Sequence, residues 1–354
     1  MSLVLSVTSR TIEVPFTIGT NLIPQGLKLS QEIGRQCIIT TETLSPLLPI
    51  LKDPILVPSH EAIKNRAMKE WIEEILYERG VNRDVVLIAI GGGTLLDLVG
   101  FVASTFMRGV ALILFPTTLL AMTDAAIGGK NGVNLKEGKN WIGTYYHPRH
   151  VYIDLNFLQT LPQDIWIQGL SETIKHALIA DQEFFYFLKE NLPLILQRDL
   201  SVVEKMIKKS VSIKCAIVEQ DPFEENGLRF VLNFGHTVAH ALEVQSKYLL
   251  PHGEAVAMGM IVEAAMSLRL GLLNQEVYEK IITLVKAIPF ELTFPKYLSY
   301  ELILRDKKNG LFVALSDIGK PVLKGIDSTL FKQGWNDALR DSQRELLSCS
   351  YGCK

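Results

Sequence analysis

Residues 88–97 read IAIGGGTLLD, which joins the end of a buried strand to the start of a helix. A strand is predicted over Val85–Ile90, because a continuous apolar run is typical of a parallel strand that is covered on both faces. Three glycines then allow a sharp turn, and the following residues, Thr94–Phe106, have a helical pattern. Backbone N–H groups at such a turn, with the helix N-terminus behind them, suit a bound phosphate.

The segments on either side of this turn alternate between strand and helix patterns. Cys37–Thr40 is predicted as a short strand, Glu61–Gly80 as a helix that ends at a glycine, and Ala111–Phe115 as a second buried strand. This alternation is typical of a parallel α/β sheet. We therefore predict that residues 1–161 form a Rossmann-like α/β domain.

Two alternatives stay open for the glycine turn. The spacing is not G-x-G-x-x-G, so a tight turn without a ligand explains it equally well, and Asp97 could then serve only the helix dipole. However, Thr117 and Thr118 directly follow the second buried strand. The carboxyl ends of parallel strands meet at the edge of the sheet where ligands bind. Polar groups at two strand ends therefore favour a ligand site.

The pattern changes after Pro162, where long helices take over. Strand patterns are scarce until Leu311–Leu315, so we predict a mainly α-helical domain over residues 162–354. The predicted helices of this region are Gln168–Ala180, Phe184–Gln197, Ser201–Glu219, Leu228–Tyr248 and His252–Leu270.

Composition excludes several classes of protein. The chain has 354 residues, 48% of them apolar, and a formal net charge of −2, which argues against a disordered chain and a nucleic-acid-binding protein. Its apolar runs are too short to span a bilayer, and its start does not resemble a signal peptide, so we expect a cytoplasmic protein without a membrane partner. Cys37 and Cys215 are predicted to be reduced core residues, whereas Cys349 and Cys353 lie in a polar tail.

Glycine, asparagine and lysine are concentrated between Asp124 and Tyr146. The segment contains GGKNGVN at residues 128–134 and EGKN at residues 137–140. Ammonium groups and accessible backbone N–H groups suit a phosphate site. The alternative is a solvated surface loop, which the apolar residues on both sides of the segment make less attractive.

Three histidines and a glutamate in the helical region suggest a metal site. His236 and His240 stand four residues apart on one helix, His252 opens a later one, and Glu172 lies on an earlier one. Histidine and carboxylate ligands suit zinc or a similar borderline metal. Spacing alone favours His236 and His240 as ligands, but the glutamate of H-E-x-x-H is missing, so a metalloprotease is a poor fit. Hydrogen-bonded core histidines are the other possibility.

With these motifs, the chain resembles the 3-dehydroquinate synthase family from about Glu61 to Lys320. The matching blocks, in the order of the family, are GGGTLLDLVGF (91–101), FMRG (106–109), PTTLL (116–120), GGKNGVN (128–134), GKN (138–140), GLR (227–229), NFGHT (233–237) and HGEAV (252–256).

The resemblance implies roles for particular residues. Metal ligands are Glu172, His236 and His252, which hold one divalent ion, zinc or cobalt, and leave positions open for two substrate hydroxyls. The implied NAD contacts are Glu61, Lys64, Gly92, Gly93, Asp97, Thr117, Thr118, Lys139, Phe157 and Thr160. The implied substrate contacts are Arg108, Asp124, Lys130, Asn140, Lys175, Lys214, Arg229, Asn233, His240 and Lys320. Among these, the implied catalytic residues are Lys130, Asn140, Lys175, Arg229 and His240.

The resemblance also implies a reaction and an assembly. A homodimer is expected, in which Arg108 reaches the substrate phosphate of the neighbouring subunit. The substrate is an anionic sugar phosphate, 3-deoxy-arabino-heptulosonate 7-phosphate, which is converted to 3-dehydroquinate and phosphate in the shikimate pathway. NAD takes a hydride from C5 and later returns it. In between, phosphate leaves by β-elimination; ring opening and an aldol step then close the carbocycle.

Two kinds of enzyme are the main alternatives. A cyclase for sedoheptulose 7-phosphate or glucose 6-phosphate would handle a substrate without a carboxylate, whereas the presence of Arg229, Asn233, His240 and Lys320 favours an acid. A polyol dehydrogenase of similar fold would release NADH. One departure from the family also stands out, because Thr40-Thr41-Glu42 occupies the place where many relatives carry an aspartate for the ribose hydroxyls.

Overall fold

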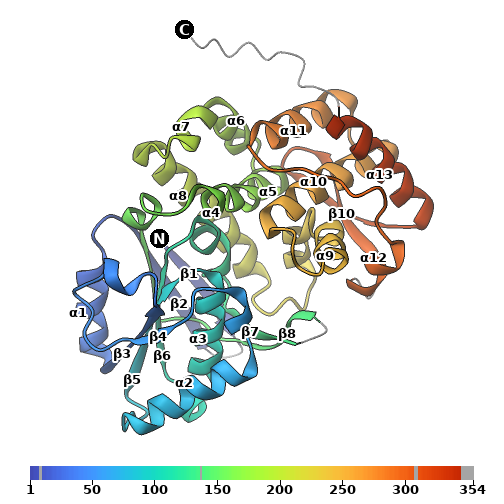
Figure 1. Ribbon diagram of the computed structural model, residues 1–354. Coiled ribbons are helices and arrows are strands. Elements are labelled where there is room, and N and C mark those ends of the chain that lie inside the picture. Colours follow the sequence, from blue (N-terminus) through green and yellow to red (C-terminus); the bar gives the residue numbers. More distant parts are fainter. Residues whose placement is uncertain (8–9, 136–137, 307–309, 344–354) are drawn as a thin grey trace. The chain divides into compact units, whose positions relative to one another are not determined.

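The chain folds into two compact units, which are described separately here (Figure 1). The computed structural model describes residues 1–7, 10–135, 138–306 and 310–343. Cys349 and Cys353 lie outside these ranges. Unit 1 consists of Met1–Trp166 and Arg198–Gly227, and unit 2 consists of Ile167–Gln197 and Leu228–Lys354.

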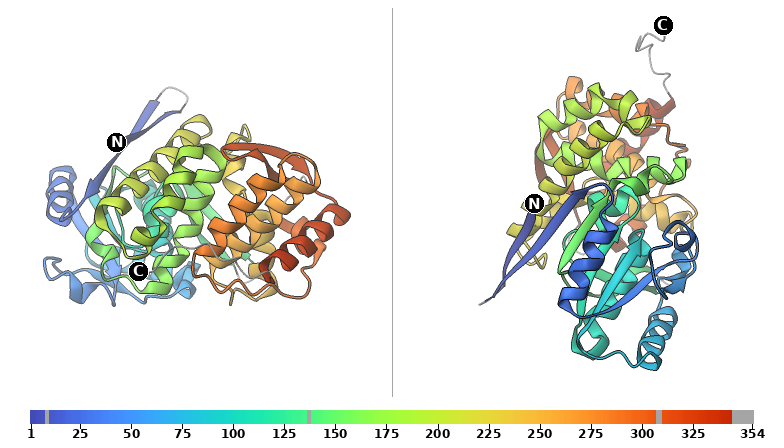
Figure 2. Two further views of the ribbon diagram at one scale, coloured as in Figure 1. Left: turned by 90° about the horizontal axis from the view of Figure 1, so that it is seen from above. Right: turned by 90° about the vertical axis from the view of Figure 1, so that its left-hand side faces the viewer.

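Unit 1 is built on a seven-stranded sheet of order β1-β2-β9-β6-β5-β3-β4. Only β1 runs antiparallel to its neighbour; the other pairs are parallel. The strands are β1 (Ser2–Val7), β2 (Arg10–Gly19), β3 (Arg35–Thr41), β4 (Ile55–Val57), β5 (Val85–Gly91), β6 (Ala111–Pro116) and β9 (His150–Asp154). The first half of β2 pairs with β1 and its second half with β9, so the β1–β2 ribbon extends away from the rest of the sheet (Figure 2).

Helices cover both faces of this sheet. Val86, Ile88 and Ile90 of β5 pack with Phe115 of β6 beneath α1, while α2 and α3 lie on the opposite face (Figure 1). Burial on both faces explains why β5 and β6 are continuous apolar runs. The helical segments of unit 1 are α1 (Ile23–Ile33), η1 (Ser45–Leu47), η2 (Glu61–Ile63), α2 (Arg66–Glu78), α3 (Gly93–Thr105), η3 (Phe106–Arg108), η4 (Ala121–Ala125), η5 (Leu155–Leu158), α4 (Gln163–Gln168, which runs to the unit boundary) and α8 (Leu200–Gln220).

Helix α8 belongs to unit 1, although the sequence analysis groups it with the helical half of the chain. Its buried stripe, which includes Val203, Ile207 and Val211, packs against β1 and η4. The spacing of four residues places these side chains on one face of the helix. The region after residue 162 therefore contributes α8, as well as most of α4, to the first unit.

The lysine-rich segment forms a hairpin and not an irregular loop. Its strands are β7 (Lys130–Leu135) and β8 (Gly138–Tyr145), which pair antiparallel, and β7 packs against α3. Gly100 of α3 permits this contact, because a Cβ there would lie 1.8 Å from the Asn131 side chain. The hairpin is thus fixed on the helix that begins at the glycine turn.

Unit 2 is mainly helical, with one two-stranded hairpin. Its segments are α5 (Leu170–Ala180), α6 (Gln182–Glu190), α7 (Leu192–Leu196), η6 (Leu228–Asn233), α9 (His236–Gln245), α10 (His252–Arg269), α11 (Gln275–Ala287), α12 (Tyr300–Asp306), β10 (Leu311–Asp317), β11 (Lys320–Gly325) and α13 (Ser328–Gln343). Helix α10 is buried on nearly every side and packs with α5, α9, α11, α13 and β10. An all-round apolar helix is expected at the centre of a helical unit.

The predicted fold class is confirmed. A mostly parallel α/β sheet precedes a helical region, as the strand and helix patterns indicate. None of the helices in the described ranges is long and apolar enough to cross a membrane.

Candidate active site

Three side chains of unit 2 converge in the way that a metal site requires. Glu172 comes from α5, and His236 and His252 are the first residues of α9 and α10. One oxygen of Glu172, Oε1, lies 3.2 Å from Nε2 of His236 and 3.3 Å from Nε2 of His252. The three ligand atoms all lie within 4.8 Å of one another. Of the four side chains considered from the sequence, His240 is the one left out of this group.

These separations fit a tetrahedral ion. Zinc binds histidine nitrogen and carboxylate oxygen at about 2.0–2.2 Å, which places neighbouring ligand atoms of a tetrahedron roughly 3.3–3.5 Å apart. The two distances from the Glu172 oxygen, 3.2 and 3.3 Å, lie just below that range and at its short end. Three protein ligands leave a position for another molecule, which is typical of catalytic zinc sites.

Burial and charge set the protonation of this cluster. Glu172 is fully buried; burial raises the pKa of its carboxyl, but Lys175, followed by His236 and His252, outweighs that effect and holds the pKa well below its usual range. Burial and Lys175 lower the pKa of His236 to about 4. For His252, burial is outweighed by Glu172 and Glu243, so its pKa rises to about 10. Near neutral pH the cluster thus holds a carboxylate, a neutral His236 and a protonated His252, whose proton a binding cation must displace.

The second ring nitrogen of each histidine also has a partner. Nδ1 of His236 lies 3.2 Å from the carbonyl oxygen of Phe234, and Nδ1 of His252 lies 3.4 Å from Oε1 of Glu243. A partner at Nδ1 fixes the tautomer and directs Nε2 toward a metal. Glu243 is not among the residues predicted from the sequence, although it stands seven residues after His236, two turns along the same helix face.

Other predicted residues of unit 2 differ in their burial. Lys175 is buried and its ammonium group lies against Oε2 of Glu172. Arg229 is buried in η6, and Asn233 ends that segment. The ring of His240 lies 5.4 Å from that of His236, measured between centroids. Lys320 is exposed at the start of β11 and pairs with Asp317 at 3.3 Å.

The carboxyl ends of two strands meet at the glycine turn of unit 1. Gly91 of β5 lies opposite Pro116 of β6, and the N–H of Thr117 donates to the Gly91 carbonyl at 3.0 Å. A Cβ on Gly92 would lie 3.2 Å from the methyl group of Thr118. Gly92 and Gly93 therefore open α3 directly beside the two threonines, as the order of the strands predicts.

A polar network surrounds the first turn of α3. Nζ of Lys64 lies 2.5 Å from Oδ2 of Asp97 and 2.5 Å from Oδ1 of Asn140. The side chain of Asn134 donates to Glu61 at 2.9 Å and accepts from the backbone N–H of Asn140 at 3.0 Å. Four residues with separately predicted roles are thus brought together, and Asn134, which had no predicted role, links them.

Two further lysines of unit 1 are paired with carboxylates. Lys214 of α8 is buried and lies 2.6 Å from Oδ1 of Asp124, so two predicted substrate contacts touch each other. Lys130 lies 2.5 Å from Oε2 of Glu224, a residue that the sequence analysis did not select. On β8, Lys139 is half-buried.

The last three predicted residues of unit 1 lie on its surface or near it. Phe157 is partly buried against the core beneath α1. Thr160 is exposed, and its hydroxyl donates to the backbone carbonyl of Phe157 at 3.4 Å. Arg108 is exposed and has no hydrogen bond or ion pair with other described residues. It precedes β6, whereas Thr117 follows that strand, so the six-residue strand separates them by about 20 Å.

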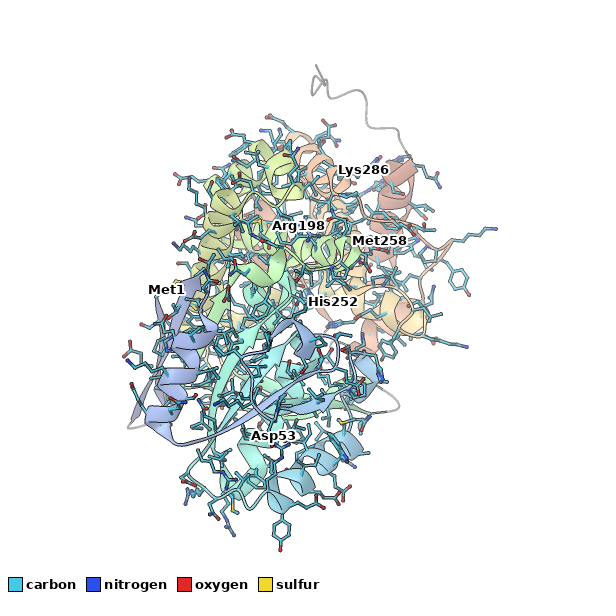
Figure 3. The ribbon with its side chains drawn as sticks, turned by 60° about the vertical axis from the view of Figure 1, so that its left-hand side comes forward. Met1, Asp53, Arg198, His252, Met258 and Lys286 are labelled. Atoms are coloured by element: carbon cyan, nitrogen blue, oxygen red, sulfur yellow. The ribbon has the colours of Figure 1, made fainter. Side chains whose placement is uncertain are left out.

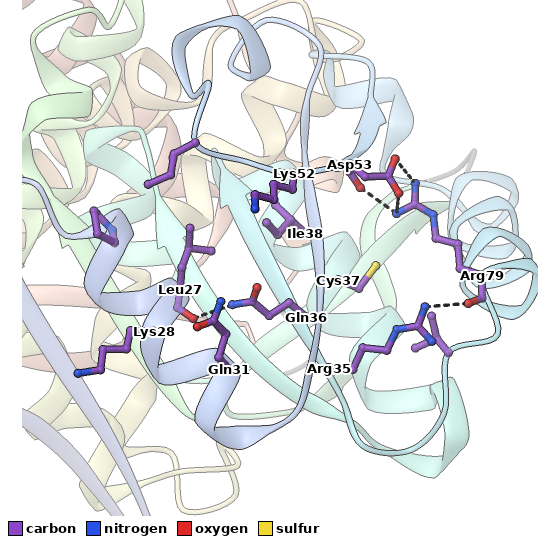
Figure 4. A pocket seen from close by; sticks show the side chains of 13 residues that line it. Leu27, Lys28, Gln31, Arg35, Gln36, Cys37, Ile38, Lys52, Asp53 and Arg79 are labelled. Carbon is purple, nitrogen blue, oxygen red and sulfur yellow. Dashed lines mark hydrogen bonds and ion pairs between the residues drawn. The ribbon is translucent and has the colours of Figure 1, made fainter.

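A pocket of about 610 Å³ in unit 1 lies away from all of these residues (Figure 4). It borders the first half of β3 and is lined by residues that include Lys28, Arg35, Lys52 and Arg79. Arg35 donates to the backbone carbonyls of Arg79 and Gly80, so its guanidinium is used structurally. The convergent polar groups at Glu172 in unit 2 and at the glycine turn in unit 1 are therefore better candidates for ligand binding than this pocket.

Two family models together match most of the chain. Residues 54–168 match the family model for the 3-dehydroquinate synthase N-terminal region, and residues 169–309 match the model for its C-terminal region. In fold, the chain is similar to 2-epi-5-epi-valiolone synthase from Streptomyces hygroscopicus subsp. jinggangensis 5008, whose structure holds NAD+ and Zn2+. That similarity has a TM-score of 0.85 at 24% identity and covers 96% of this chain and 98% of the other.

Two curated relatives extend the match along the sequence. The chain is 45% identical over 258 residues to the 3-dehydroquinate synthase of Sulfurisphaera tokodaii, covering 73% of each chain. It is 34% identical over 355 residues to the 3-dehydroquinate synthase of Shewanella halifaxensis, covering 95% of this chain and 96% of that protein. The chain therefore belongs to the 3-dehydroquinate synthase family of phosphate-eliminating lyases.

Proposed function

We propose that this enzyme performs the 3-dehydroquinate synthase reaction with one divalent ion, zinc or cobalt, held by Glu172, His236 and His252. The observation that carries the proposal is the convergence of two imidazole nitrogens on one oxygen of a fully buried glutamate. Lys175 compensates the charge of this carboxylate through its other oxygen, so Oε1 and the two imidazole nitrogens together offer three donor atoms to a cation. The donor set suits a borderline metal.

NAD is assigned to the glycine turn of unit 1. Gly92 and Gly93 present the N-terminus of α3 to a pyrophosphate, and Thr117 and Thr118 offer hydroxyls beside it. Asp97, Lys64 and Glu61 belong to the polar network at the same helix. Lys139, Phe157 and Thr160 complete the proposed contacts. When bound, NAD supplies the hydride chemistry and the metal ion polarises substrate oxygens.

The cationic residues of the site suit a substrate with both a phosphate and a carboxylate. Lys175, Lys214 and Arg229 are buried, so their charges act in a medium where an anion is attracted strongly. With Lys130, Asn140, His240, Asn233, Lys320 and Asp124, they form the proposed contact set. The proposed substrate is 3-deoxy-arabino-heptulosonate 7-phosphate, and the proposed products are 3-dehydroquinate and phosphate.

Lys175 has a second proposed task besides contacting substrate. Its ammonium group lies against the Glu172 oxygen that does not face the histidines. It therefore keeps that carboxylate ionised and holds the other oxygen toward the two imidazoles. Charge-assisted contacts of this kind fix the orientation of a buried side chain.

Arg108 is proposed to act across a homodimer. It is exposed, and the length of β6 separates it from Thr117 at the carboxyl edge of its own sheet. A guanidinium forms paired bonds with phosphate oxygens, so an exposed arginine in this position suits the substrate phosphate of a neighbouring subunit. The alternative is a surface residue that contributes little.

A phosphate-release assay with three substrates tests the function. The purified enzyme is given zinc, a catalytic amount of NAD and one of three sugar phosphates: the seven-carbon acid, sedoheptulose 7-phosphate or glucose 6-phosphate. We expect phosphate release from the acid alone, without accumulation of NADH, because the cofactor is restored in each turnover. Preferred release from either of the two sugar phosphates that lack a carboxylate would support another cyclase. Steady NADH formation from a simple alcohol would support a polyol dehydrogenase.

A further inference from the structure

Two buried glutamates outside the ligand set contact the histidine-bearing segments of unit 2. Glu243 lies on α9 and is 3% exposed, and Glu263 lies on α10 and is fully buried. Neither is assigned to the metal, NAD or the substrate above. Burying a carboxylate costs several kcal/mol unless it gains charged or hydrogen-bonding partners. Their partners therefore indicate what these residues do.

Glu243 holds the ring of a ligand that belongs to the other helix. Its Oε1 lies 3.4 Å from Nδ1 of His252, while Nε2 of the same ring faces Glu172. With the Nδ1–H directed at a carboxylate, Nε2 is the ring nitrogen that gives up its proton when a cation binds. The contact links the last turn of α9 to the first residue of α10. Without Glu243, the ring is free to take the other tautomer or to turn away.

Glu263 fixes the segment that carries the other histidine. Its Oε2 accepts from the N–H of Gly235 at 2.8 Å, and its Oε1 faces the N–H of Val238 at 3.4 Å. These groups lie at the N-terminus of α9, where Gly235 has no side chain to satisfy them and adopts a positive φ of 81°. A carboxylate is favoured there by the helix dipole. His236 follows Gly235 directly, so the position of its ring depends on this cap.

A close approach of the two helices makes both contacts possible. A Cβ on Gly259 of α10 would lie only 1.9 Å from the carbonyl oxygen of Gly235. His252, Gly259 and Glu263 are spaced by seven and four residues, so they share one face of α10. That face of α10 packs against the N-terminus of α9, which begins at His236. Figure 3 labels His252 and Met258 of α10.

We propose that Glu243 and Glu263 are reciprocal positioning residues for the metal site. Each helix contributes one histidine ligand and one glutamate that holds the ligand-bearing end of the other helix. This inference rests on the proposed metal site and adds two residues that do not touch the ion. Partners of this kind typically change metal affinity 10–100-fold when they are removed.

Zinc affinity tests the proposal directly, by competition with a chromophoric chelator in the full-length enzyme. We expect Glu243→Ala and Glu263→Ala to weaken zinc binding by about 10–100-fold. Glu243→Gln should recover most of the affinity, since an amide oxygen can still accept from Nδ1–H. Glu263→Gln should recover less, because one of its two acceptors becomes a donor that faces an N–H group. Glu276→Gln on α11, which removes an exposed charge, is the matched control and should bind zinc normally.

The visible spectrum of bound cobalt is a second measurement. It would not change if the two glutamates only stabilised the fold. The visible spectrum of the bound ion reports ligand geometry, so the two alanine variants should alter it at saturating cobalt while the control does not. If Glu243→Ala fails to fold, Glu243→Leu, which also removes the acceptor, is measured in the same assays; if Glu263→Ala fails to fold, Glu263→Gln is measured. Zinc affinity within twofold of the unaltered enzyme, together with an unchanged cobalt spectrum, would overturn the proposed role of that residue. Failure of the unaltered enzyme itself to bind zinc would refute the metal site instead.

Discussion

The substitution Gly259→Ala probes how tightly α9 and α10 are held together at the metal site. The added methyl group would lie 1.9 Å from the Gly235 carbonyl oxygen, whereas real Cβ atoms almost never approach within 3.0 Å of another heavy atom. Because the obstacle is backbone and not the end of a flexible side chain, the two helices must separate by about 1 Å. The segment that moves is the one that carries His236.

The expected effect has two parts. Overpacking a close contact costs about 1–3 kcal/mol, and the better helix propensity of alanine returns up to about 1 kcal/mol of that. The free energy of unfolding should therefore fall by up to about 2 kcal/mol. Zinc affinity should fall by about tenfold or more, since ligand distances in a metal site are held to within roughly 0.2 Å.

Both quantities are measured on the same protein. Urea unfolding of the metal-free form gives the change in stability, and chelator competition gives the zinc affinity. Gly325→Ala in β11 is the matched control, because a Cβ at that exposed position meets no atom within 4 Å. Its unfolding free energy should stay within about 0.5 kcal/mol of the unaltered value. Normal zinc binding by Gly259→Ala, whatever its stability, would refute the link between this close approach and ligand geometry.

Two other perturbations test separate parts of the molecule. Arg108→Ala and Glu172→Ala should each be nearly inactive alone. Co-expression of the two should restore roughly a quarter of normal activity, because half of the randomly paired dimers carry one complete site out of two. Hybrids as inactive as their parents would exclude a contact of Arg108 across the dimer. Burial lowers the pKa of His150 from 6.5 to about 4, so the folded protein resists a proton that the unfolded chain binds. Stability should therefore fall as pH drops through this window, by at most about 1.4 kcal/mol per pH unit from this residue. His150→Phe, which preserves a ring against Tyr152, should show a shallower loss in urea unfolding between about pH 7 and pH 5; an unchanged slope would contradict the assignment.

The elements with strong local signals could be predicted from the sequence. The buried strands at Val85 and Ala111 and the helix that begins at His252 are long, regular patterns whose type follows from residue spacing. The hairpin of β7 and β8 is harder to predict from the sequence, because its glycines and asparagines are also typical of loops. Packing against α3 decides its structure, and that contact is not visible in the local sequence.

The candidate site shows the same limit more sharply. Helix spacing favours His236 and His240 as a ligand pair, yet the atoms that meet belong to His236, His252 and Glu172. The family resemblance identifies this set, whereas periodicity cannot show which helices meet. Glu263 was missed for this reason, since its partners lie on another helix and are backbone groups.

Metal content of two histidine variants tests the central assignment most directly. The comparison is between His252→Ala and His240→Ala, each purified after growth with zinc and analysed for bound metal per chain. We expect His252→Ala to lose its zinc, because one of three ligands is gone, and His240→Ala to retain about one ion per chain while losing activity. A zinc-free His240→Ala beside a zinc-loaded His252→Ala would contradict the assignment of the site.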